Sequence, residues 1–198
     1  MKGKKMAKFL FLFLLSTVFH GTLRSEIEQI TIRWTAQLCQ NSCIKLLERE
    51  LGKVKGIDQL SIDQAGGQAT LSWKKNVPFQ YAQINTAMHM VGLSMRDIRI
   101  KVTGAVKHSG ETFYMISEGD NTRFDLVNPV TPRPHGQADE FNAYARKISP
   151  ALKKQLIDGE TQRQTATIEG PVFMPERMTV PTQIVVDKLD FASQADKK

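Results

Sequence analysis

The stretch that decides the fold is residues 29–73, which read QITIRWTAQLCQNSCIKLLERELGKVKGIDQLSIDQAGGQATLSW. Its first six residues alternate apolar and polar side chains with a period of two, which predicts a strand at 29–34. Residues 42–55 then carry an apolar stripe at helical spacing. The members of that stripe are Ile44, Leu47, Leu51 and Val54. Gly56 ends the helix.

The pattern continues with a hairpin and a second helix. Residues 58–63 and 69–73 alternate again, and Gly66-Gly67 between them supplies the positive backbone angles of a tight turn. A second helix is predicted for 81–91, and a further alternating run begins at Met95. This order is that of a ferredoxin-like βαββαβ domain, a four-stranded antiparallel sheet with two helices on one face. We assign it to residues 27–100.

The second half predicts a small barrel. Further strands are expected at 112–117, 122–127, 165–173 and 183–189, with one helix at 139–157 that Pro150 kinks or splits. Together with the alternating run that continues through Ile98, Ile100, Val102 and Val106, this gives three strands, a helix and two strands. That is the order of an OB-like β-barrel, here residues 101–191, followed by a disordered tail at 192–198. The fold class is therefore α+β. Since no Pro- or Gly-rich linker separates the halves, we expect the last strand of the first to continue into the second.

Residues 1–25 read as a signal peptide. Four lysines precede the apolar core Phe9–Leu15, and a more polar segment follows. The apolar run is shorter than the ~20 residues that span a bilayer, although an uncleaved anchor is the alternative. Cleavage would leave 22 basic and 20 acidic side chains from a chain of formal charge +7. We therefore expect an exported protein, periplasmic or secreted, with no transmembrane segment in the mature chain and no nucleic-acid partner.

The first half resembles the heavy-metal-associated domain of copper chaperones and metal-transporting ATPases. Counting from Cys43, the chain has the family's landmarks along and beyond its first helix. These are Leu47-Glu48, Leu51, Val54 and Gly56-Ile57. The family's loop motif is Gly-Met-x-Cys-x-x-Cys, whereas this chain has Ala36-Gln37 in place of Gly-Met, Gln40 at the first cysteine position, and Cys39 one residue earlier. The resemblance implies a metal site on that loop.

Cys39 and Cys43 are the only cysteines. Thiolates favour Cu(I) or zinc, and a helix N-terminus lowers a thiol pKa, so the pair predicts a soft-metal site, Cu(I) first and zinc second. A disulfide without metal is the alternative, because export favours oxidation. Inert thiols are the third reading. Additional donors could come from Met88, His89, Met90 and Met95, although core packing for Met88 and solvent for His89 are the simpler reading.

No catalytic motif accompanies these residues, and we expect no enzyme. Six side chains on the barrel strands are candidates for a ligand face, although core packing for the aromatic ones and a solvated face for the others are the simpler reading. They are Lys107, His108, Phe113, Tyr114, Arg123 and Phe124. The sequence thus predicts an exported, non-catalytic protein that traffics or sequesters a soft metal through Cys39 and Cys43. The alternative is an envelope interaction or scaffold protein with a Cys39–Cys43 disulfide, whose barrel contacts an envelope protein.

Overall fold

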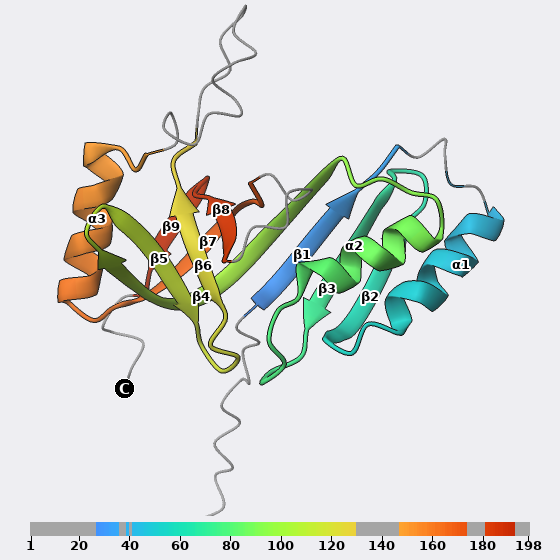
Figure 1. Ribbon diagram of the computed structural model, residues 1–198, viewed down its shortest axis with the longest axis horizontal. Coiled ribbons are helices and arrows are strands. Elements are labelled where there is room, and N and C mark those ends of the chain that lie inside the picture. The colour runs from blue at the N-terminus through green and yellow to red at the C-terminus, as the bar shows by residue number, and fades with distance from the viewer. Residues whose placement is uncertain (1–26, 36–38, 40, 130–146, 174–180, 193–198) are drawn as a thin grey trace, which may run out of the picture.

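The computed structural model describes residues 27–35, 39, 41–129, 147–173 and 181–192. They form a mixed α/β structure with three helices and one hydrogen-bonded sheet of nine strands (Figure 1). The expected signal peptide, most of the loop before the first helix, the first part of the expected 139–157 helix and nearly all of the expected tail lie outside the described residues. None of the helices in the described ranges is long and apolar enough to span a bilayer.

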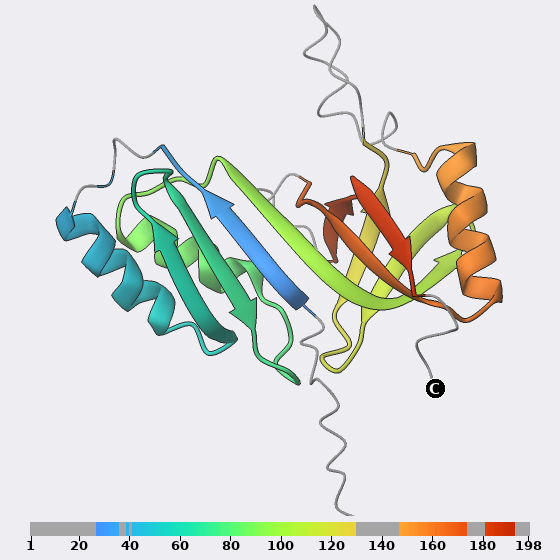
Figure 2. The same ribbon diagram turned by 180° about the vertical axis from the view of Figure 1, so that it is seen from behind.

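The first half is a four-stranded antiparallel arrangement in the order β2-β3-β1-β4. Its elements are β1 (Ile27–Arg33), α1 (Asn41–Gly52), β2 (Ile57–Asp63), β3 (Gln68–Trp73), α2 (Tyr81–Met90) and β4 (Asp97–Ser109). Both helices cover one face of these strands, and the view from behind shows the other face without a helix (Figures 1 and 2). The period-two pattern of β1 explains this, because Ile30 and Ile32 are buried whereas Gln29 and Arg33 are exposed.

The second half continues from β4. Its elements are β5 (Thr112–Ser117), β6 (Arg123–Val127), α3 (Pro150–Thr161), β7 (Thr165–Pro171), β8 (Thr182–Val185) and β9 (Lys188–Phe191). β4 pairs antiparallel with β5 and β7, β6 pairs parallel with β8, and β7 pairs with β9. β4 serves both halves, since residues 97–102 pair with β1 and residues 104–109 with β5. The expectation of a shared strand is confirmed.

The helix expected at 139–157 can be compared with the structure only from residue 147 onward, and there its bounds differ. Residues 147–149 are not helical, and α3 begins at Pro150 and extends to Thr161. Proline lacks an N–H and fits the first helical position, and the Ser149 hydroxyl accepts a hydrogen bond from the Leu152 N–H at 3.3 Å. Pro150 therefore occupies the first position of α3 and does not kink it.

Two other boundaries differ from expectation. α1 stops at Gly52 instead of residue 55, because Lys53 and Val54 donate to the carbonyls of Glu50 and Leu51 in a tighter turn. The expected last strand is split into β8 and β9 at 186–187. The Asp187 N–H there bonds to Glu169 of β7 as well as to the Val185 carbonyl, so the chain leaves its pairing with β6 and joins β7.

One continuous apolar core runs through both halves. Phe79, in the loop between β3 and α2, joins them. Its ring lies 5.2 Å from that of Trp73 and 5.8 Å from that of Phe124 on β6. Its backbone N–H donates to Asp120 Oδ2 at 3.1 Å and Thr122 Oγ1 at 3.0 Å in the β5–β6 turn. Packing and hydrogen bonds at Phe79 therefore hold the two halves together.

Candidate functional site

The two cysteines lie at the start of α1, where the sequence placed them. Their sulfurs are joined in a disulfide, with the Cα atoms 5.2 Å apart. Cys39 is 2% exposed, and Cys43, in the first turn of α1, is partly buried against the core. A disulfide sulfur carries no thiolate charge, so this state lacks the soft-metal ligands that the metal hypothesis requires. Metal ligation by this pair needs prior reduction.

The additional donors that the sequence suggested are spread over different environments. Met88 is fully buried in the core, His89 is exposed, and Met90 is 67% exposed. Met95 is partly buried and packs against the core. The simpler reading of Met88 and His89 is thus confirmed. Within the described ranges, no three His, Cys, Asp or Glu side chains gather closely enough to hold a metal ion.

The six barrel candidates separate by face. Phe113 and Phe124 are 1% and 0% exposed, so core packing is confirmed for both and neither lies on a ligand face, because period two directs alternate side chains into the core. Tyr114 faces outward with the Arg123 guanidinium 4.1 Å from its ring centroid, and Arg123 also pairs with Asp125 at 2.8 Å. His108 stacks on Phe113 and contacts Glu160 of α3, and Lys107 is exposed.

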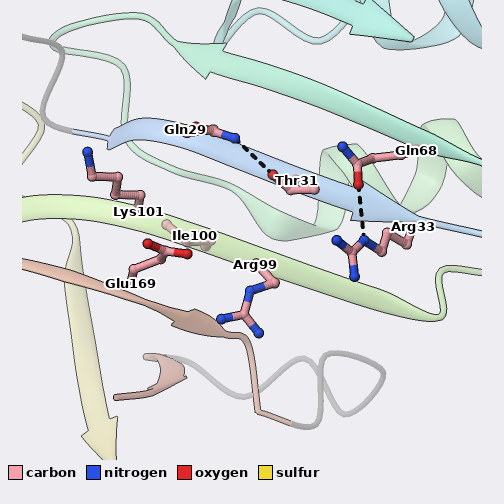
Figure 3. Close-up of a pocket in the computed structure, with 8 residues that line it drawn as sticks. All are labelled: Gln29, Thr31, Arg33, Gln68, Arg99, Ile100, Lys101 and Glu169. Atoms are coloured by element: carbon pink, nitrogen blue, oxygen red, sulfur yellow. Dashed lines mark hydrogen bonds between the residues drawn. The ribbon is translucent and has the colours of Figure 1, made fainter. Parts of the chain in front are cut away.

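A polar groove that was not predicted from the sequence lies on the face of the sheet opposite α1 and α2. It has a volume of about 260 Å³ and lies over β1 and β4, with one residue each from β3 and β7 (Figure 3). Its lining residues are Gln29, Thr31, Arg33, Gln68, Arg99, Ile100, Lys101 and Glu169. Antiparallel register places them together, because Thr31 lies opposite Arg99, and Arg33 lies opposite Gln68.

Most charges in the groove are paired. Arg99 contacts Asp187 at 2.6 Å, Lys101 contacts Glu28 at 2.5 Å, and Glu169 contacts Lys188 at 3.0 Å. Arg33 differs, because its Nε donates to the side-chain oxygen of Gln68 at 3.0 Å, an uncharged partner (Figure 3). The groove therefore contains polar groups held in place by neighbours, together with one guanidinium that has no carboxylate partner among the described residues.

A sequence signal for the groove exists but is incomplete. Gln29, Thr31 and Arg33 alternate with buried residues, and so do Arg99 and Lys101. Such a pattern predicts a polar sheet face. It becomes a groove only because β1 pairs with β4 and β7 pairs with the other edge of β4. Those pairings are non-local, so periodicity alone does not show them. Comparison of the chain with protein-family models, with curated proteins and with solved structures gave no match.

Proposed function

We propose that this chain is an exported, non-catalytic binding protein in which the Cys39–Cys43 disulfide fastens the start of α1 and the polar groove contacts the ligand or partner. The observation that carries the proposal is the bond between the two sulfurs. A disulfide in which Cys39 is buried cross-links the chain locally and offers no soft-metal ligand. The groove is then the surface where polar side chains converge around a concave space.

Export is supported by two independent features. The first 25 residues have the charged, apolar and polar segments of a signal peptide. Disulfides persist mainly in oxidising compartments, and this chain has two cysteines that are bonded to each other. A periplasmic or secreted location accounts for both features.

The fold assignment belongs to the same proposal. The order β2-β3-β1-β4, antiparallel with both helices on one face, supports a ferredoxin-like first half. The pairings of β4 with β5 and β7, of β6 with β8 and of β7 with β9 support an OB-like second half. Under this proposal the likeness to the heavy-metal-associated domain is one of architecture, in which Leu47 and Leu51 keep their core positions.

A second candidate function is soft-metal binding by the reduced chain. Cys43 lies in the first turn of α1, where the helix dipole stabilises a thiolate, and Cys39 lies within bonding reach of it. Two thiolates are enough for Cu(I), which accepts a low coordination number, whereas a structural zinc site requires four ligands. This function requires a reductant in the compartment where the protein works.

A copper titration separates the two functions. The exported chain, purified without reductant, would be titrated with Cu(I) in competition with a chromogenic chelator, beside Cys43→Ser. The proposal predicts that neither chain takes up a stoichiometric ion. One tightly bound Cu(I) on the parent and none on the variant would overturn it in favour of metal trafficking. Repeating the titration on the reduced parent tests the second candidate directly.

A further inference from the structure

Arg33 is the distinctive group of the groove. The other two lining cations, Arg99 and Lys101, each contact a carboxylate. Arg33 is exposed, and its only side-chain hydrogen bond among the described residues is the one from Nε to Gln68. A guanidinium has five N–H donors, so four remain on the outer fork. These donors form the planar edge that binds carboxylate or phosphate through two parallel hydrogen bonds.

The strand pairing holds this fork in position. Arg33 of β1 lies opposite Gln68 of β3, and the amide oxygen fixes the Nε side of the guanidinium. Figure 3 shows the fork in the space between β1 and β4. Because the hydrogen bond to Gln68 restricts the side chain before a ligand arrives, less conformational entropy is lost on binding.

The neighbouring acids limit what the groove can accept. Asp97 lies opposite Arg33 on β4 but makes no ion pair with it, and Glu169 is held by Lys188. Two carboxylates this close to the groove weaken its positive potential, and they would repel a large polyanion. The positive lining of Arg33, Arg99 and Lys101 is confined to a volume of about 260 Å³. This is slightly below the range of about 300–1,000 Å³ for drug-sized ligands.

We infer that the groove binds a small polar oxyanion, a carboxylate or phosphate on a molecule about the size of a monosaccharide, with the Arg33 fork as its anchor. The inference rests on the proposed function and specifies its ligand. The lining offers Gln29, Thr31 and Gln68 to hydroxyl or amide groups of the ligand. It contains no aromatic side chain, so the site recognises charge and hydrogen bonds, and ring stacking contributes nothing.

Three sugars with the same ring test the inference: glucuronate, glucose 6-phosphate and glucose. Each would be titrated into the oxidised chain with an ¹⁵N label, and the Arg33 side-chain Nε–H and the amides of β1 and β4 followed by NMR. We expect saturable shifts in these signals with one or both acids and none with glucose. A response to glucuronate alone identifies a carboxylate ligand, and a response to glucose 6-phosphate alone identifies a phosphate.

Arg33→Gln removes the charge and the fork but keeps a polar side chain at an exposed position. Affinity for the responding acid should fall about tenfold or more, because charge-assisted hydrogen bonds are lost. Lys45→Gln is the matched control, since it removes one exposed charge on α1, which covers the opposite face of the sheet from the groove (Figure 1). It should leave the affinity unchanged.

The inference is overturned if neither acid shifts the groove signals, if glucose shifts them equally, or if both variants lose affinity to the same extent. Any of these results leaves the copper titration unaffected, so the proposed function would stand with its ligand reassigned. Conversely, stoichiometric binding of Cu(I) by the native parent would overturn the proposed function, whichever of the sugars bind.

Discussion

Gly56 shows how a single residue constrains the fold. It follows α1, and a Cβ atom added there would lie 1.9 Å from the Trp73 ring. Trp73 is 2% exposed, and its indole N–H donates to the Val77 carbonyl at 2.7 Å, so the ring cannot swing aside. The sequence predicts Gly56 as the residue that ends the first helix. Packing against Trp73 also requires a glycine at this position, which the sequence alone does not reveal.

Gly56→Ala should lower the free energy of unfolding by about 1–3 kcal/mol, the usual cost of overpacking. Gly52→Ala is the control, because the same added methyl group meets nothing within 4 Å at the end of α1. Its effect should be neutral or stabilising, by no more than about 1 kcal/mol. Urea denaturation of the three chains measures both values. Equal stability of Gly56→Ala and the parent would contradict the packing argument.

Glu50 gives the chain a defined acid sensitivity. Lys53 Nζ donates to both carboxylate oxygens at 2.8 and 2.7 Å, and Arg49 donates to one of them at 3.2 Å. The hydrogen bond from Lys53 lowers the pKa of Glu50 below its ordinary value, although partial burial works in the opposite direction. A carboxyl group with a lowered pKa stabilises the fold above its unfolded-state pKa. That stabilisation is lost as the pH falls through the folded-state value.

Glu50→Gln should therefore be less stable than the parent at neutral pH. The difference should shrink as the pH falls below the ordinary carboxyl range and through the lowered pKa. Urea midpoints measured at several pH values follow it. Glu48→Gln, an exposed change on the same helix, should show no comparable convergence. A constant gap between Glu50→Gln and the parent at all pH values would rule out the lowered pKa as the cause.

At the scale of elements, local sequence signals predict whether a segment forms a helix or a strand better than they predict where it begins and ends. Every strand expected before residue 174 and both helices of the first half exist, because strong periodicity and Gly stops define them. The helical state expected for residues 147–149 and the single last strand expected at 183–189 were wrong. Both depend on contacts outside the local window, Ser149 with Asn128 and Asp187 with Glu169. The sequence predicted that the two cysteines lie at the start of the first helix, but it did not decide between free thiols and a disulfide.

The disulfide should act on α1 locally. It closes a five-residue loop, which limits its chain-entropy contribution to about 2 kcal/mol. Cys39→Ala/Cys43→Ala should therefore remain folded, with stability reduced by about that amount and faster amide exchange confined to the first turn of α1. Dithiothreitol treatment of the parent is the matched control and should give the same loss. Loss of the whole fold in the double variant would show that the bond does more than fasten the helix.

At the scale of the whole molecule, β4 and Phe79 make the halves one cooperative unit. β4 belongs to both sets of strands, and the Phe79 contacts cross between them. Sequence indicated the shared strand through the lack of a linker. The Phe79 contact joins residues about forty positions apart and had no local signal. The groove also depends on such distant pairing, which explains why it was missed.

Unfolding should accordingly occur in one transition. Trp34 and Trp73, the two tryptophans, both lie in the first half, so their fluorescence reports that half alone. NMR amide intensities from β5 and β7 report the second half. The two urea curves should coincide within error. Separate midpoints would mean that the halves unfold independently, contrary to the shared core and strand.

The central claim is that the native chain carries bonded cysteines and no soft metal. Intact mass of the chain purified from the exported fraction without reductant, under native and then denaturing conditions and with and without alkylation, tests it most directly. We expect a metal-free mass, lighter by two hydrogen atoms than the reduced chain, with no alkylation until reductant is added. A metal that leaves on denaturation, with both thiols then free to alkylate, would contradict it.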